Sequence, residues 1–174
     1  MSEIRRPLLV LLFGLIFVLL QGMFRHLVGE GVPVPNLVLL LVVFLALHEG
    51  SLAGAVLAFL LGLELDLASG VLVGPWAGAC VASFGVLASV SQRIFIDSRF
   101  VAVLAAFACS IISSVLYLFV VFEFKPAVFT LAPFSLLEAM LNAALAPLCF
   151  GLFRVVLVRR ERIGAAGRLR SVHV

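Results

Sequence analysis

Long apolar runs separated by short polar stretches dominate this chain of 174 residues and limit what it can fold into. The apolar fraction is 64%, only 12% of the residues are charged, and the mean hydropathy is +1.31. Soluble domains are about 45–50% apolar and about 25% charged, so the composition excludes a soluble globular domain. A membrane-spanning helix needs about 20 apolar residues. We therefore expect an all-α, polytopic membrane bundle of about six spans, at 7–24, 35–48, 51–67, 72–92, 100–122 and 131–158.

The stretch from Leu37 to Leu63 could form one long span or two short ones. One span would place His48 and Glu49 near the bilayer centre, where a charge costs at least about 2.5–3.5 kcal/mol. Two short, tilted helices let both residues reach the headgroups. Six spans with both termini inside put 10 of the 12 Arg and Lys residues on the cytoplasmic side and two outside, as the positive-inside rule requires. The sequence favours six spans.

Residues that could carry chemistry are few. The chain has nine acidic residues and three histidines, with no HExxH, GxSxG or P-loop pattern. Each of the three cysteines lies inside an apolar run and reads as a small buried side chain. We expect neither an enzyme nor a resident metal or cofactor, and no nucleic-acid partner.

Small residues recur at intervals of four from Gly50 through Gly54 and Ala58 to Gly62. Such a small-xxx-small ridge allows two helix backbones to approach closely. It could pack against another helix of the same bundle, or it could dock a partner protein.

A second pattern consists of polar and turn-forming residues near the predicted outer ends of spans. Asp66 precedes Gly70 and Gly74, which we expect to form a turn. Asp66 could tether that turn by accepting backbone N–H bonds. Alternatively, it could converge with Glu138 and Asn142, which share one face of the last span, in a polar pocket in the outer half of the bundle.

Two further features lie in the last part of the chain. Pro147 removes a backbone donor from the last span and predicts a kink there. The tail 159–174 is basic and includes Arg159, Arg160 and Arg162. It predicts contact with anionic lipid headgroups, at about 1 kcal/mol per Arg, or docking of a cytoplasmic protein.

Three segments resemble the rod shape-determining MreD family. Pro35–Phe44 is similar to the Leu-rich second span of that family, and Gly62–Gly74 resembles its Gly-Leu-x-x-Asp-x-x-x-Gly-x-x-x-Gly signature. Leu141–Leu148, followed by a basic tail, is similar to its last span. The chain departs from the usual pattern at Pro75 and Trp76.

The resemblance implies a non-catalytic scaffold of the bacterial cell-elongation complex in the inner membrane. It implies binding to MreC and, through MreC, to RodA, its transpeptidase partner and MreB, in support of lateral peptidoglycan synthesis. The family also looks like the S-components of energy-coupling-factor transporters, which suggests an outer cavity that could hold a lipid. A solute-binding S-component is therefore the alternative function, and a lipid-modifying enzyme fails for want of an acid–base pair.

Overall fold

The computed structural model describes residues 2–29, 32–70, 72–91, 99–123 and 132–158, which form six α-helices and one short π-helix. The helices are α1 (Ser2–Val28), α2 (Leu37–His48), α3 (Leu52–Ser69), α4 (Pro75–Ser91), α5 (Arg99–Phe122) and α6 (Ala132–Phe153), and α6 continues into the π-helix η2 (Arg154–Val158). The expected all-α polytopic bundle is confirmed. In the described ranges, α1, α3, α5 and α6 are long and apolar enough to cross a membrane, whereas α2 and α4 are shorter.

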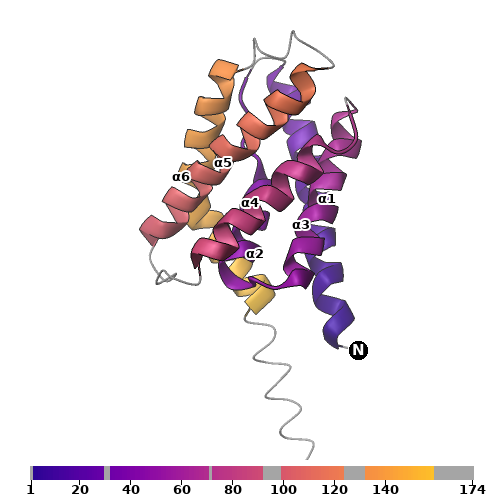
Figure 1. Cartoon of the computed structure of the whole chain (residues 1–174), viewed down its shortest axis with the longest axis vertical. Coiled ribbons are helices and arrows are strands. Elements are labelled where there is room, and N and C mark those ends of the chain that lie inside the picture. Colours follow the sequence, from indigo (N-terminus) through magenta and orange to yellow (C-terminus); the bar gives the residue numbers. More distant parts are fainter. Residues whose placement is uncertain (1, 30–31, 71, 92–98, 124–131, 159–174) are drawn as a thin grey trace, which may run out of the picture.

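The five longer helices form a ring around α2 (Figure 1). Around this ring α1 contacts α3, α3 contacts α4, α4 contacts α5, and α5 contacts α6. The π-helix η2, which continues α6, contacts α1 and so completes the ring. The central α2 contacts all five of them. We call the end of the bundle where α1 begins and η2 ends the terminal end, and the opposite end the far end.

The sequence of α2 explains its central place. Its residues are apolar on every face, and ten in succession, Val38–Leu47, are buried. A helix that is hydrophobic all round is stable where every face meets apolar neighbours. At 12 residues α2 is about 18 Å long, which is shorter than a hydrocarbon core of about 30 Å. The predicted span 35–48 stays a prediction.

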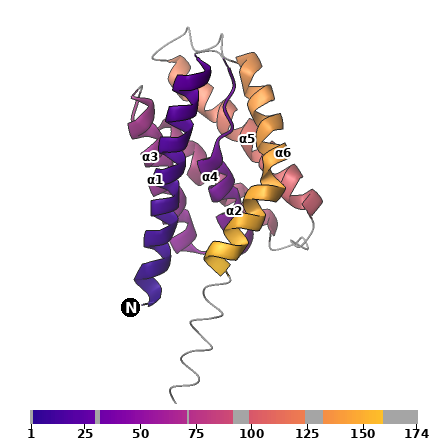
Figure 2. The same ribbon diagram turned by 180° about the vertical axis from the view of Figure 1, so that it is seen from behind.

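Non-helical backbone from Val32 to Asn36 leads from the far end to the start of α2 and runs between α1 and α6 (Figure 2). Val34 and Asn36 are each 5% exposed. Irregular backbone at membrane depth is tolerated only where protein surrounds it. Pro33 and Pro35 ease the requirement further, since neither has an N–H that needs a partner.

The turn between α2 and α3 confirms that Leu37–Leu63 forms two helices. Ser51 caps α3 by accepting a hydrogen bond from the Gly54 N–H at 3.3 Å. In the same turn, Glu49 forms an ion pair with Arg6 of α1. This pair fixes the start of α1 to the terminal end of the bundle.

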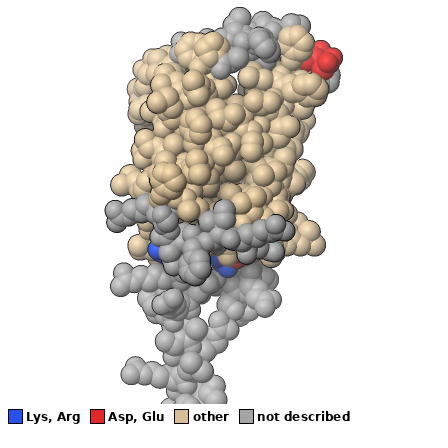
Figure 3. All heavy atoms as spheres, turned by 60° about the vertical axis from the view of Figure 1, so that its left-hand side comes forward, with Lys and Arg blue, Asp and Glu red and all other residues tan. Residues whose placement is uncertain are grey.

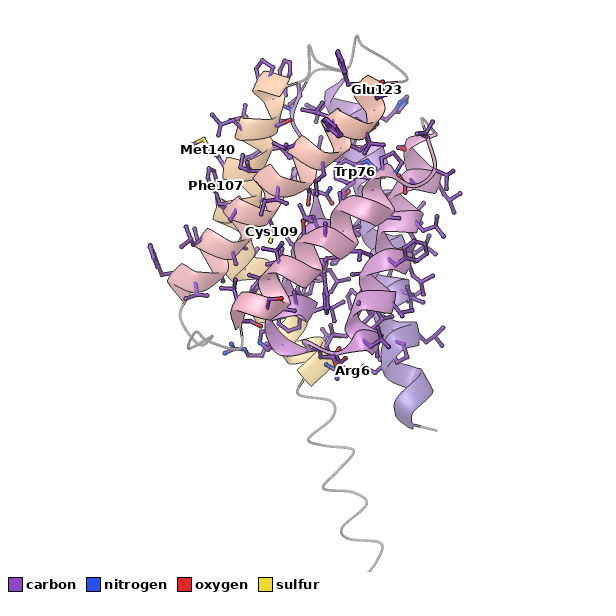
Figure 4. All side chains as sticks on the ribbon, viewed as in Figure 1. Arg6, Trp76, Phe107, Cys109, Glu123 and Met140 are labelled. Atoms are coloured by element: carbon purple, nitrogen blue, oxygen red, sulfur yellow. The ribbon has the colours of Figure 1, made fainter. Side chains whose placement is uncertain are left out.

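On the face of the molecule shown in Figure 3, the coloured charged residues lie near the two ends of the bundle. Glu123 lies at the far end and Arg6 at the terminal end (Figure 4), with a broad uncharged band between. Cys80 and Cys109 are buried and Cys149 is half-buried; all three are free thiols. These features, with four long apolar helices, fit a multi-pass membrane protein.

Candidate functional site: the polar interior of the bundle

Asp66 lies at the far end of α3 and is only 1% exposed. Its Oδ2 accepts hydrogen bonds from the backbone N–H groups of Gly74 at 2.9 Å and Ala77 at 3.0 Å, and its Oδ1 accepts one from Trp76 at 2.9 Å. A helix begins with N–H groups that have no partner inside the helix. Gly74, which precedes α4, has no side chain to cap them, so Asp66 caps α4 from the preceding helix.

The backbone between the two helices suits this cap. Gly70 ends α3 in the left-handed conformation at φ 63°, and Gly74 has φ 123°. Both values favour glycine because it lacks a Cβ. Pro75 then begins α4 at the position where a missing N–H costs least. The spacing of Asp66, Gly70 and Gly74 is thus that of a carboxylate-capped helical turn.

Asn142 of α6 joins three elements in the centre of the bundle and is fully buried. Its Oδ1 accepts a hydrogen bond from the backbone N–H of Asn36 at 2.7 Å, and its Nδ2 donates one to Ser110 Oγ of α5 at 2.9 Å. Ser110 in turn donates to the carbonyl of Ala106 at 2.7 Å. Asn142 therefore ties α6 to α5 and to the start of α2.

The start of α2 is capped by side chains although it lies inside the bundle. Asn36 Oδ1 accepts from the Leu39 N–H at 3.0 Å. With the side-chain amide of Gln21 turned so that its oxygen faces α2, that oxygen accepts from Leu37 N–H at 2.7 Å and Val38 N–H at 3.2 Å. These bonds supply partners for the first N–H groups of α2 where no water is at hand.

Gly54, Ala58 and Gly62 are buried within the bundle. A Cβ added to Gly62 would lie 2.5 Å from Ala77 Cα and 2.6 Å from the Trp76 carbonyl oxygen. One added to Gly54 would lie 2.7 Å from the Phe84 ring. The ridge is thus in contact with α4 of the same chain. Gly50, its first member, is exposed before the start of α3.

Asp66 and Asn142 belong to two separate hydrogen-bond networks. In the described ranges, no hydrogen bond joins either of them to Glu138, which is half-buried on α6 and lies within Coulombic range of Arg25. A ligand pocket formed by these three residues stays a prediction. The kink at Pro147, which lies inside α6, also stays a prediction, and Arg159, Arg160 and Arg162 fall outside the described residues.

Sequence reasoning missed several polar residues that form hydrogen bonds inside the bundle, namely Gln21, Asn36, Ser83, Ser110 and Ser113. Ser83 and Ser113 join α4 to α5 through their hydroxyls at 2.8 Å. Asn36 did carry a recognisable signal, because an Asn directly before an apolar run is a preferred helix cap.

Trp76 and Tyr117 stack with their ring centroids 4.6 Å apart near the far end (Figure 4).

The protein is thus a polytopic helical membrane protein. Its interior is filled by its own helix α2, and its buried polar groups bond to one another. The family model described as rod shape-determining protein MreD matches residues 1–156. The chain therefore belongs to the MreD family. Proteins of this family determine rod shape and are associated with the rod-shape complex. Comparison with curated proteins and with solved structures finds no match.

Proposed function

We propose that this protein is a non-catalytic membrane scaffold of the bacterial cell-elongation complex. It binds MreC and, through MreC, connects to RodA, its transpeptidase partner and MreB, and so supports lateral peptidoglycan synthesis. The observation that carries the proposal is the family match over residues 1–156.

The buried polar side chains form hydrogen bonds within the protein, and this supports a scaffold function. Both carboxylate oxygens of Asp66 accept backbone hydrogen bonds. The amide oxygen and nitrogen of Asn142 are both bonded to protein groups. These side chains stabilise the fold, and a substrate would have to displace structural bonds in order to reach them.

The packing of the bundle interior is also relevant to the alternative function, that of a solute-binding S-component. Such a subunit would need room for a vitamin-sized ligand inside the bundle. Here α2 fills the centre towards the terminal end, and Val34 and Asn36 are buried on the way to it. A cavity of about 440 Å³ lies between α5 and α6 instead. This arrangement favours the scaffold.

The proposed setting is the bacterial inner membrane, with both termini in the cytoplasm. Ser2 of α1 and the end of η2 lie at the same end of the bundle (Figure 1). Ten of the 12 Arg and Lys residues of the chain fall on the cytoplasmic side in this orientation, as the positive-inside rule favours.

Affinity purification from native membranes in mild detergent tests the proposal. Tagged protein should recover MreC, with or without RodA, at levels well above those from membranes that carry the untagged protein. Recovery of a transporter ATPase pair without MreC would contradict the scaffold and support the S-component.

A further inference from the structure

Glu64 of α3 has a carboxyl oxygen that the bundle leaves without a partner. The residue is half-buried, and its Oε2 is buried with no hydrogen bond to any residue that the structure describes. The carboxyl group lies against Gly14 of α1, because a Cβ added to that glycine would lie 2.5 Å from Oε2. Gly14 thus leaves the space that this carboxyl group occupies in the seam between α1 and α3.

The position of Gly14 near the middle of α1 places the carboxyl group deep in the membrane. Along the helix, Gly14 is about 18 Å from Ser2 and about 21 Å from Val28. The adjacent side chain of Leu15 is 47% exposed, as expected where a helix faces lipid tails. A charged side chain at such a depth is costly unless it has a partner of opposite charge or water.

Helix α1 offers no counter-charge near this point. From residue 7 to residue 24 it has no charged or titratable residue. Arg6 and Arg25 are the nearest on either side, about 12 Å and about 16 Å from Gly14 along the helix. Arg6 forms its ion pair with Glu49 at the terminal end.

The other helices that contact α3 have no cation near Glu64 either. Their titratable residues are His48, at the end of α2, and the buried thiol Cys80 of α4. On α3 itself, Asp66 is bound by three backbone N–H groups at the start of α4. In such apolar surroundings a neutral carboxylic acid costs much less free energy than an unpaired carboxylate.

We propose that Glu64 is a proton-binding site in the seam between α1 and α3, and that the folded protein holds it as the neutral acid at neutral pH. The bound proton favours the packing of α1 on α3, because a carboxylate would be drawn out of the seam towards water. The inference concerns this chain alone, so its failure would leave the proposed function unaffected.

The pH dependence of thermal unfolding in detergent tests the site. Unfolding brings Glu64 to water, where a glutamate ordinarily has a pKa of about 4.3 and loses its proton. Unfolding therefore releases a proton, and a rise in pH should destabilise the wild-type protein. Glu64→Gln keeps the shape of the neutral acid and has no proton to release. The unfolding temperature of Glu64→Gln minus that of wild type should rise by about 5 °C between about pH 5 and about pH 8.

Glu123→Gln, at an exposed site, is the matched control. Water surrounds the Glu123 carboxyl group in both the folded and the unfolded chain, so the difference between this variant and wild type should stay constant with pH. A constant difference for Glu64→Gln as well, or one that falls as the pH rises, would overturn the inference.

Labelling of native membranes with dicyclohexylcarbodiimide gives a second readout. The acid proton moves to a carbodiimide nitrogen, the carboxyl oxygen bonds to the central carbon, and the acyl group then migrates to nitrogen, so the whole reagent is added and nothing leaves. Fragment mass spectrometry should find at least tenfold more adduct on Glu64 than on Asp66, and none at position 64 in Glu64→Gln. More adduct on Asp66 than on Glu64 would overturn the inference, and the unfolding comparison decides if neither is labelled.

Discussion

Asn142 Oδ1 accepts a hydrogen bond from the backbone N–H of Asn36 at 2.7 Å, although 106 residues separate the two along the chain. This bond holds the start of the central helix α2 against α6. It satisfies a donor at the point where extended backbone becomes helix, deep inside an apolar bundle. The position of α2, and with it the filled interior, depends on such side-chain partners.

Replacing Asn142 by Leu should destabilise the bundle. The change leaves the Asn36 N–H buried without an acceptor, which costs about 1–3 kcal/mol. Denaturant unfolding in detergent, followed by circular dichroism, measures the loss. Met140→Leu, at a position 56% exposed on the same helix, serves as the control. Equal stability of Asn142→Leu and wild type would contradict the role of this bond.

Asp66→Ala should cost more than Asp66→Asn. Alanine removes all three hydrogen bonds to the start of α4, and bonds to a charged group contribute about 1.5–3 kcal/mol each. We expect a loss of at least about 3 kcal/mol for alanine and a smaller one for asparagine, which keeps one acceptor oxygen. Thermal unfolding in detergent ranks the two, and Glu123→Gln, at an exposed site, should have little effect. The reverse order would exclude Asp66 as the cap of α4.

Gly62→Ala and Gly78→Ala form a matched pair. The new Cβ at Gly62 would meet the α4 backbone at 2.5–2.6 Å, whereas nothing lies within 4 Å at Gly78. Overpacking at Gly62 should cost about 1–3 kcal/mol. At Gly78, the higher helix propensity of alanine should keep the change within about 1 kcal/mol of wild type. Similar losses at both positions in a thermal-shift assay would show that close packing of α3 on α4 is not the cause.

The ion pair between Arg6 and Glu49 should couple α1 to the turn between α2 and α3. Their side chains are 28% and 22% exposed, so solvent screens the pair only in part. A double-mutant cycle with Arg6→Gln and Glu49→Gln should give a coupling energy of about 0.5–1 kcal/mol. Strict additivity of the two single changes would mean that the pair contributes nothing to holding α1.

The helices and the turn at Gly70 could be predicted because apolar runs, breakers and caps are local signals. The position of α2 in the centre of the bundle could not be predicted from the sequence. Residues such as Leu40 and Phe44 would look the same whether they faced lipid or protein, since both surroundings are apolar. The hydrogen bonds of Asn142 join segments that are distant in sequence, and no local pattern encodes such pairs. One of the two interpretations of Asp66 offered by the sequence was a tether of the turn after α3. Its hydrogen-bond partners at the start of α4 could not be predicted, because they depend on how α3 and α4 pack.

Native mass spectrometry of the complex released from membranes tests whether this protein is a scaffold, since it measures the mass of every molecule that stays bound to the chain. We expect a species whose mass equals this chain plus MreC. A species consisting of this chain and a stoichiometric small ligand of several hundred daltons, with no MreC, would exclude the scaffold function and identify a solute-binding subunit.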